Sequence, residues 1–359
     1  MTINLNTSKQ RTITVSEELG KGGEGIVYAI AGQTDQVAKL YHTPNRTAEK
    51  EQKLKAMIAN PPLDESRSFS PPHISIAWPS ELLYIGNQFA GFSMPRIAQS
   101  PDIFKYYNPT ARMSEFSNFD WRYLHRTAQN LAIALHALHL RGYVMGDVNQ
   151  KNILVTPSAL VTLVDTDSFQ VVDNNGTIHR CPVGVPEYTP PELQGVRFDQ
   201  IDRTSFHDNF GLAILIFQLL MEGYHPFTGS PVDPTISVKG EVYLYCIKQG
   251  IFPYQSNQLF APPLNAPNFD ALHPALQSLF LRCFVNGHFV STARPNALDW
   301  VHALGNTEKA LVQCVNNPTH WYANSINGCN WCQRESRNGT VNSSISTRQQ
   351  PLPTISRQS

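Results

Sequence analysis

A polar loop between two regular elements, residues 143–155, constrains the fold of this chain more than any other stretch. Before it, an amphipathic segment from about Trp121 to Leu140 predicts a helix that is ended by Gly142. After it, Ile153 to Val155 form a short β-type run. Asp147 and Asn152 stand five residues apart between these elements, which is a favourable position for catalytic side chains.

A second acidic site follows the loop. The apolar run of residues 160–164 ends in Asp165, and Asp167 comes two residues later. We expect Asp147, Asn152 and Asp165 to lie close together. Asp147 would accept a proton from an attacking hydroxyl, while Asn152 and Asp165 would offer the oxygen ligands that Mg²⁺ takes beside phosphates. The pattern predicts phosphoryl transfer. Asp and Asn are also common in ordinary turns, so the Asp-x4-Asn spacing by itself favours a turn over a catalytic site. The prediction therefore needs support from elsewhere in the chain.

That support begins with a glycine-rich stretch near the N-terminus, preceded by the alternating, strand-like run of residues 12–15. It reads G-x-G-x-x-G-x-V, with Gly20, Gly22, Gly25 and Val27 at the defining places. Glycines let the backbone close over phosphates. A dinucleotide-binding turn would need a helix directly afterwards, but residues 26–30 are β-prone, so a strand–loop–strand hairpin fits better.

Together these stretches resemble a protein kinase catalytic domain over about residues 12–305. The resemblance implies an α+β, bilobal fold: an N-lobe and hinge (12–97) with an antiparallel sheet plus one helix, and a mainly helical C-lobe (98–305). It also implies ATP and Mg²⁺ (or Mn²⁺) as cofactors. The expected reaction is transfer of the γ-phosphate to protein hydroxyls, with serine or threonine the favoured acceptors and autophosphorylation expected.

The resemblance also assigns roles in the N-lobe. The run Val37-Ala38-Lys39-Leu40 is similar to the V-A-x-K strand, so Ala38 is assigned to the nucleotide site and Lys39 would hold the α- and β-phosphates. Residues 45–58 have helical composition and end before two prolines, so they match helix C. We expect Glu51 to pair with Lys39, because Leu54 and Ile58 lie three and seven residues beyond it. Glu49 is the alternative.

The adenine site is assigned by position along the chain. Residues 82–85 and 89–94 are β-prone, and the second run leads into the hinge. Met94 matches the gatekeeper, while the Pro95 carbonyl and the Ile97 amide would face adenine. Proline is compatible there, since that hinge residue offers only its carbonyl. Leu154, after the catalytic loop, would line the same nucleotide site.

The catalytic loop departs from the H-R-D-x-K-x-x-N pattern of the family and is similar to the G-D-x-N loop of divergent bacterial kinases. Gly146 replaces the arginine that contacts a phosphorylated activation loop, which puts that mode of activation in doubt. Asn149 replaces the usual lysine, and Lys151 is the nearest substitute. Asp165-Thr166-Asp167 stands in place of D-F-G, so Asp165 is expected to bind the metal and Asp167 to be a second ligand or a cap.

Three further features match the C-lobe of a kinase. Residues 184–192 resemble the G-T-P-E-Y-x-A-P-E stretch that receives the substrate. Glu192 should form a structural pair with Arg294. Asp208, at the start of an apolar helix that runs to Met221, should cap the backbone of the catalytic loop. Separately, a single helical segment is expected from about Ser114 to Leu140.

A cysteine and histidine cluster follows the kinase-like region. Cys314, His320, Cys329 and Cys332 supply four ligands with the spacing of a small structural zinc ribbon, expected over residues 306–332. Because all four ligands come from protein, such a site would be closed and not catalytic. The alternatives are a C-x-x-C redox pair or a chance cluster. Residues 333–359 lack apolar periodicity and predict a disordered tail.

Composition excludes some functions. The formal net charge is zero, so nothing recommends nucleic acid as a partner. The polar N-terminal extension (1–11) lacks the apolar core of a signal peptide, and the longest apolar stretch, near Phe210 to Met221, is too short to cross a bilayer. We therefore expect a soluble, cytoplasmic protein that does not bind membranes.

Two other functions remain open. The changes at Asn149 and at the D-F-G position favour a nucleotide-binding pseudokinase or scaffold, with a partner protein docking on the zinc element. A small-molecule phosphotransferase is disfavoured by the substrate-receiving stretch of residues 184–192. The identity of a protein substrate is not encoded in any motif of the chain.

Overall fold

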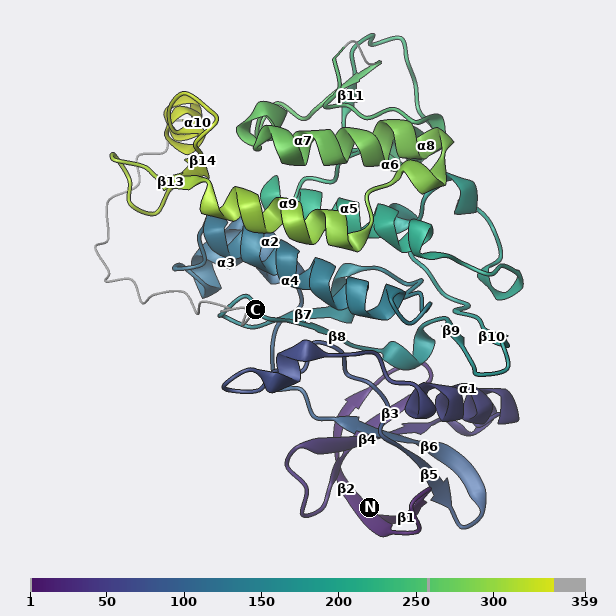
Figure 1. Ribbon diagram of the computed structural model, residues 1–359. Coiled ribbons are helices and arrows are strands. Elements are labelled where there is room, and N and C mark those ends of the chain that lie inside the picture. The colour runs from purple at the N-terminus through teal and green to yellow at the C-terminus, as the bar shows by residue number, and fades with distance from the viewer. Residues whose placement is uncertain (1, 257–258, 339–359) are drawn as a thin grey trace.

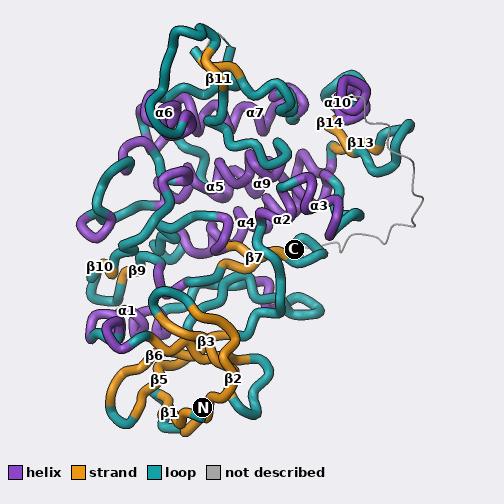
Figure 2. Tube along the Cα trace, turned by 180° about the vertical axis from the view of Figure 1, so that it is seen from behind, coloured by secondary structure: helices purple, strands orange, loops and turns teal. Residues whose placement is uncertain are grey.

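The protein folds into two lobes, as the computed structural model shows for residues 2–256 and 259–338. The smaller lobe holds the N-terminal strands and one helix, and the larger lobe is mainly helical (Figure 1). Seen from behind, the longest strands gather at one end of the molecule and the helices fill the other (Figure 2). The predicted α+β, bilobal fold is confirmed.

The sheet of the smaller lobe is a closed, antiparallel barrel in the order β1-β2-β3-β4-β6-β5. Its strands are β1 (Ile3–Thr7), β2 (Thr12–Lys21), β3 (Gly25–Ile30), β4 (Gln36–Tyr41), β5 (Glu81–Ile85) and β6 (Gln88–Pro95). The expected N-terminal extension of residues 1–11 is therefore wrong, because β1 pairs with both β2 and β5 and closes the barrel. Closure leaves no free sheet edge.

Strand β6 approaches β4 unusually closely at Gly91. A Cβ atom at this position would lie 2.0 Å from the carbonyl oxygen of Lys39. Only glycine permits this distance. The close approach fixes the strand that carries Lys39 against the strand that leads into the hinge.

Helix α1 (Ala48–Ala59) crosses the barrel beside β5 and β6. The Thr47 side chain caps its first turn by accepting a hydrogen bond from the Lys50 N–H. The helix ends before Pro61, which cannot continue it. The predicted helix of residues 45–58 is thus confirmed, with its start three residues later than expected.

The larger lobe is built around helices α4 and α5. Its helices are α2 (Phe104–Tyr107), α3 (Pro109–Glu115), α4 (Trp121–His139), α5 (Ser205–Leu220), α6 (Val242–Gln249), α7 (Pro274–Leu281), α8 (Gly287–Phe289) and α9 (Ala297–Lys309). Its short strand pairs are β7 (Ile153–Val155) with β8 (Val161–Leu163), β9 (Val171–Val172) with β10 (Ile178–His179), and β11 (Ser230–Pro231) with β12 (Phe260–Ala261). The single helix expected from Ser114 to Leu140 is wrong in part, because Asp120 caps a new helix at Trp121.

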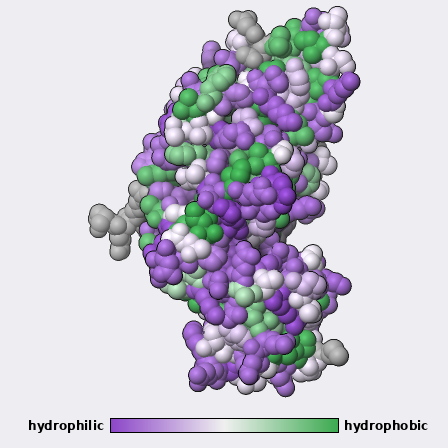
Figure 3. Space-filling model, turned by 90° about the vertical axis from the view of Figure 1, so that its right-hand side faces the viewer, coloured by the Kyte–Doolittle hydropathy of each residue, from purple (hydrophilic) through white to green (hydrophobic). Residues whose placement is uncertain are grey.

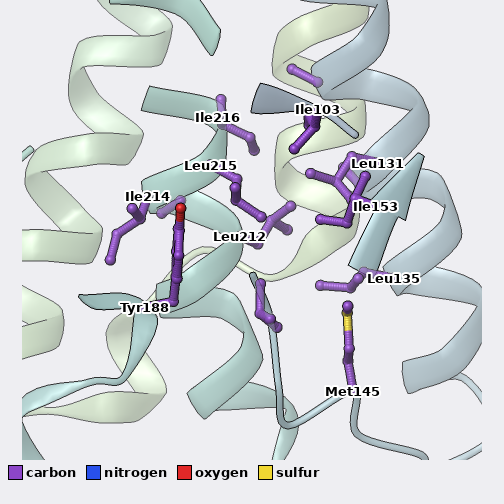
Figure 4. Close-up of a cluster of buried hydrophobic side chains, with 14 of the residues drawn as sticks. Ile103, Leu131, Leu135, Met145, Ile153, Tyr188, Leu212, Ile214, Leu215 and Ile216 are labelled. Atoms are coloured by element: carbon purple, nitrogen blue, oxygen red, sulfur yellow. The ribbon is translucent and has the colours of Figure 1, made fainter. Parts of the chain in front are cut away.

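Apolar side chains of α4 and α5 form the core beneath the catalytic loop (Figure 4). Leu131 and Leu135 come from α4, while Leu212 and Leu215 come from α5, and all four are fully buried. Met145 of the loop reaches into the same cluster. The loop is therefore anchored on a packed base, which fixes the position of the neighbouring Asp147.

A small element follows α9: strands β13 (Leu311–Gln313) and β14 (Trp321–Ala323) form a hairpin, and α10 (Asn330–Asn338) comes next. The zinc element was expected to begin at residue 306, but α9 continues to Lys309. The disordered tail was expected from residue 333; this start is wrong because α10 includes residues 333–338, and the remainder lies outside the described residues.

The surface has no broad apolar face on the side that Figure 3 displays, where hydrophobic patches are small and separated by hydrophilic residues. The molecule narrows between its two lobes in this view. Among the residues that the structure describes, no helix combines the length and apolar character needed to cross a membrane.

The predicted pair of Glu192 and Arg294 is present. Both carboxylate oxygens accept from the guanidinium, at 2.7 and 2.8 Å, and the Arg294 side chain is fully buried. Arg294 also donates to the backbone carbonyls of Phe206 and Gly287. The pair therefore connects the segment before α5 with the turn between α8 and α9.

We predict that Glu192→Ala lowers the free energy of unfolding by about 3 kcal/mol, because it leaves a buried guanidinium without its counter-charge. Chemical denaturation of the two proteins measures the difference. Asp199→Ala is the control, since Asp199 forms an exposed pair with Arg197 and its loss should have no measurable effect. Equal stability of wild type and Glu192→Ala would contradict the structural role.

Candidate active site

The backbone of the catalytic loop is held by one buried carboxylate. Asp208 of α5 accepts hydrogen bonds from the N–H groups of Met145 (2.7 Å) and Gly146 (2.8 Å). His139, at the end of α4, lies 3.0 Å away through its Nε2 atom. The predicted capping role of Asp208 is confirmed, whereas His139 was not expected. Gly146 has a φ of +74°, which favours glycine at this place.

Asp147 follows directly, with one occupied and one available carboxylate oxygen. Its Oδ2 atom accepts from the Asn152 side chain at 3.1 Å, and its Oδ1 atom is buried without a partner among the described residues. Burial raises the pKa of Asp147, although Asn149, Asn152 and the charge of Arg203 oppose the rise. A carboxylate so placed has a free acceptor for a hydroxyl proton.

Two asparagines keep this loop in shape. The Asn152 amide nitrogen also donates to the backbone carbonyl of Asp147. Asn149, where the family has lysine, donates to the same carbonyl and accepts from the Lys151 N–H at 2.9 Å. Asn149 therefore has a local structural role. Lys151 is exposed, and its substitution for the missing lysine remains a prediction.

Lys39 connects the two lobes through its ammonium group. Its Nζ atom lies 2.7 Å from Asp165 Oδ1 and 2.7 Å from Asp167 Oδ1, and both acids follow β8 in the larger lobe. Burial lowers the pKa of Lys39, but the two carboxylates outweigh burial and raise it. The ammonium is therefore permanently charged at the junction of the lobes.

The two acids differ in exposure. The Asp167 side chain is 2% exposed and accepts from Lys39 and from the Tyr41 hydroxyl (2.7 Å), whereas the Asp165 side chain is 48% exposed. Burial opposes ionisation of Asp167, yet Lys39 and Tyr41 hold its pKa below the usual range. Asp165 thus remains accessible to a metal ion, while Asp167 is the enclosed partner of the lysine.

The expected pairing of Glu51 with Lys39 is wrong. Glu51 instead accepts from the Tyr84 hydroxyl at 3.0 Å and pairs with Lys55 at 2.6 Å. The buried face of α1 is defined by Leu54 and Met57, and helical spacing of four and seven residues places Lys50 on that face.

The rest of the inward face of α1 is also basic. Lys50 pairs with Glu24 of the glycine-rich loop at 2.7 Å, and Lys53 is buried and donates to the carbonyl of Arg180. Glu49, the alternative acid, is exposed. Asp167, expected to be a second metal ligand or a cap, therefore supplies the buried acid beside Lys39 that α1 does not.

The glycine-rich stretch forms the predicted hairpin between β2 and β3. Gly20 pairs with Val27, and the Gly22 N–H donates to the Gly25 carbonyl at 2.9 Å. Val27 in turn lies opposite Lys39 on β4. The hairpin therefore extends beside the lysine, where a phosphate-binding loop is required.

The proposed adenine contacts lie where β6 leaves the barrel. Met94 and Pro95 are paired with β4, and the Arg96 N–H donates to the Asp35 carbonyl at 2.8 Å. The expected adenine contact at Ala38 is wrong: Ala38 is fully buried and packs with Leu40 in the core of the barrel, on the face of β4 opposite Lys39. Ile97 and Leu154 are half-buried. Contact of these residues with a nucleotide remains a prediction.

The cysteine and histidine cluster is assembled. Ligand atoms of Cys314, His320, Cys329 and Cys332 all lie within 4.8 Å of one another. The Sγ atoms of Cys314 and Cys332 are 3.6 Å apart, and His320 Nδ1 lies 3.5 Å from Cys332 and 3.7 Å from Cys329. The arrangement is compatible with a bound zinc ion.

Sequence reasoning missed several residues that interact with the site acids Asp147, Asp167 and Asp208, mostly because these residues come from distant segments. Tyr41 had a signal, since residues two apart on a strand share a face and Tyr41 follows Lys39 by two. His139 and Arg203 had no local signal. The roles of Asp147, Asn152 and Asp165 in the chemistry remain predictions, but the structure brings Asp147 into contact with Asn152 and Asp165 into contact with Lys39.

We predict that Asp167→Asn lowers the free energy of unfolding by about 3 kcal/mol at pH 7, because a buried ammonium loses its enclosed counter-charge. Since the folded-state pKa of Asp167 is depressed, its contribution is present above the unfolded-state pKa and is lost as the pH falls below it. The difference from wild type should therefore shrink below about pH 4. Denaturation at several pH values measures it.

Glu51→Gln is the matched control, because this half-exposed acid contacts Lys55 and not Lys39. A larger loss of stability at Glu51 than at Asp167 would show that the buried lysine is held from α1 after all.

Comparison with known proteins found no matching family model. Among curated proteins, the chain is 37% identical over 337 residues to "Protein kinase YegI" of Escherichia coli strain K12, which covers 92% of this chain and 50% of that protein. The protein of the same name from Escherichia coli O157:H7 is 37% identical over 335 residues, with coverage of 91% and 50%. The chain thus spans about half the length of these relatives.

Among solved structures, the chain is similar to the autoinhibited serine kinase domain of the giant muscle protein titin. The TM-score is 0.58, with 17% sequence identity and coverage of 83% of this chain and 81% of the other. At this identity the likeness concerns the fold. The curated relatives show that the chain belongs to the protein kinase family, and both this fold and the arrangement of Lys39, Asp147 and Asn152 agree with that membership.

Proposed function

We propose that this chain transfers the γ-phosphate of ATP to protein hydroxyls, with serine or threonine as acceptors and its own hydroxyls among the substrates. The observation that carries the proposal is the buried Oδ1 atom of Asp147, which has no hydrogen-bond partner in the part of the chain that the structure describes and belongs to a loop whose backbone is fixed by Asp208. An acceptor held in this way is suited to a hydroxyl that approaches with its proton.

In this mechanism Asp147 orients the attacking hydroxyl and accepts its proton. Asn152 fixes the rotamer of Asp147 through its amide nitrogen, so one carboxylate oxygen is restrained and the other faces the substrate. Burial favours the protonated carboxyl, so activity should decline on the acid side at a pH above the ordinary titration range of aspartate. The hydrogen bonds from Asn149 and Asn152 and the charge of Arg203 limit this rise in the pKa of Asp147.

ATP and Mg²⁺ (or Mn²⁺) are the cofactors that the residues fit. Asn152 and the half-exposed Asp165 offer oxygen ligands, and Lys39 offers a positive charge for phosphate. The hairpin of residues 20–27 would cover the phosphates, while Met94, Pro95, Ile97 and Leu154 would surround the adenine. The metal ion, when bound, neutralises charge that develops on the transferred phosphoryl group.

A peptide acceptor is favoured by the segment of residues 184–192. The Tyr188 hydroxyl donates to Gln218 at 3.2 Å, and Glu192 is anchored by Arg294, so the middle and the C-terminal end of the segment are fixed to the larger lobe. A fixed surface beside Asp147 suits an extended protein chain better than a small molecule.

We predict that Asp147→Asn reduces phosphate transfer by at least about 10³-fold while ATP still binds, because the amide has lost the proton acceptor. Transfer from γ-labelled ATP to the chain and to generic protein substrates measures the rate, and a fluorescent ATP analogue measures binding. Asp199→Asn, which changes an exposed acid, is the control.

Equal rates in wild type and Asp147→Asn would refute the assignment. ATP binding without any turnover in wild type would instead support a nucleotide-binding scaffold, the second candidate function, which the asparagine at position 149 favours.

A structural zinc ion at the cysteine and histidine cluster is the second part of the proposal. Tetrahedral zinc with Zn–S near 2.3 Å and Zn–N near 2.0 Å separates its ligand atoms by roughly 3.5–3.8 Å. The measured separations of 3.5, 3.6 and 3.7 Å agree with this geometry. His320 turns Nδ1 to the sulfur atoms, and its Nε2 lies 3.2 Å from Glu335, as in zinc sites with a supporting carboxylate.

The zinc element packs on the larger lobe. Trp331 meets Trp121 of α4 edge to face at 5.3 Å, and Arg122 lies 3.9 Å over the Trp321 ring. Arg334 pairs with Glu222, just after α5, at 2.6 Å. The ion would therefore stabilise an element that lies against the lobe but away from Asp147.

We predict about one zinc per chain by elemental analysis, and loss of that zinc in Cys329→Ser, because three ligands cannot close the site. Chelation should expose residues beyond about 312 to protease and leave the two lobes folded. Cys246→Ser, at a buried cysteine outside the cluster, is the control and should keep its zinc. Protein purified reduced, without chelator and without zinc would refute the site.

A further inference from the structure

Arg203, in the segment before α5, is buried, with 4% of its surface exposed. Its guanidinium donates to three backbone carbonyls. One is that of Gly146 in the catalytic loop (2.5 Å), and the other two are those of Cys181 and Val183 in the stretch of residues 165–192, here called the activation segment. One side chain therefore joins the loop that carries Asp147 to the stretch that leads into the substrate-receiving residues 184–192.

The guanidinium of Arg203 is closely packed on all the groups around it that the structure describes. It lies 4.3 Å over the ring of Phe198. A Cβ atom on Gly146 would come within 2.9 Å of the Cys181 sulfur and 3.1 Å of the Arg203 guanidinium carbon. The glycine that replaces the usual arginine thus allows the activation segment to lie directly on the catalytic loop.

The backbone of Arg203 is held as firmly as its side chain. Gln170 donates to the Arg203 carbonyl at 2.7 Å and accepts from its N–H at 2.9 Å. The backbone of Gln170 in turn exchanges two hydrogen bonds with Val144, just before the catalytic loop. Arg203 is therefore fixed to the loop at both ends.

We propose that Arg203 is the positioning residue that fixes residues 181–183 on the catalytic loop, so that the activation segment is held ready for substrate without a phosphate group. The proposal rests on the proposed kinase function for its catalytic consequence. Its structural part, the anchoring of the segment, stands independently.

The test compares Arg203→Gln, Arg203→Lys and Arg197→Gln in the full chain. Arg197 is the matched control, because it belongs to the same segment but is 73% exposed in its side chain and pairs with Asp199. Hydrogen exchange of the amides of residues 181–185 reports anchoring even in a protein without turnover. Separate values of kcat and of KM for a peptide acceptor report whether the substrate-receiving residues 184–192 are held in place.

Arg203→Gln should accelerate exchange in residues 181–185 about tenfold or more, as expected for the loss of charge-assisted hydrogen bonds, and should lower kcat/KM to a similar extent. The loss should appear mainly in KM for a peptide acceptor, because the segment that leads into the substrate-receiving residues is no longer held on the catalytic loop. Arg203→Lys should recover part of the protection and part of the rate. Wild type treated with phosphatase should keep its rate.

Exchange in Arg203→Gln equal to that in Arg197→Gln would overturn the anchoring role, with or without turnover. Loss of activity on phosphatase treatment, or an unchanged kcat/KM in Arg203→Gln, would overturn the catalytic part. Accelerated exchange in a chain whose wild type never transfers phosphate would refute the kinase function and leave the anchoring role intact.

Discussion

The structure depends on one ammonium group placed between two lobes. Lys39 comes from the barrel, and its partners Asp165 and Asp167 come from the segment after β8, so the ion pairs that satisfy it also join the lobes. A buried charge must be paired, since an unpaired one would be expelled or neutralised. Because both acids lie in the larger lobe, helix α1 does not supply a carboxylate to Lys39. Its inward lysines instead contact the glycine-rich loop and the activation segment.

The catalytic loop is fixed by groups that belong to the chain and need no modification. Asp208 holds its backbone from below, Arg203 holds it from the side of the activation segment, and Asn149 closes its turn. Each of these contacts replaces or supports a position where the loop departs from the common kinase pattern. The departures at Gly146 and Asn149 are thus accompanied by internal hydrogen bonds that keep Asp147 in place.

Much of this arrangement was predictable from the sequence, where the signal is local. The order of the glycine-rich hairpin, Lys39, the loop around Asp147 and the pair of Glu192 with Arg294 follows from motifs with fixed spacing. Glu51 was assigned wrongly because the helical phase was taken from Leu54 and Ile58, whereas Met57 is the more deeply buried residue. The partners Asp167 and Arg203, and the closure of the barrel by β1, depend on contacts between distant segments that no local pattern reveals.

The central claim is that Asp167 holds the Lys39 ammonium in place for phosphate transfer, and a double-mutant cycle tests it most directly. The measurement is kcat/KM for phosphate transfer from ATP in wild type, Lys39→Met, Asp167→Asn and the double variant. If the two residues act as one unit, the double variant should lose no more activity than Lys39→Met alone. Losses that multiply, with the double variant reduced by the product of the two single effects, would contradict the account.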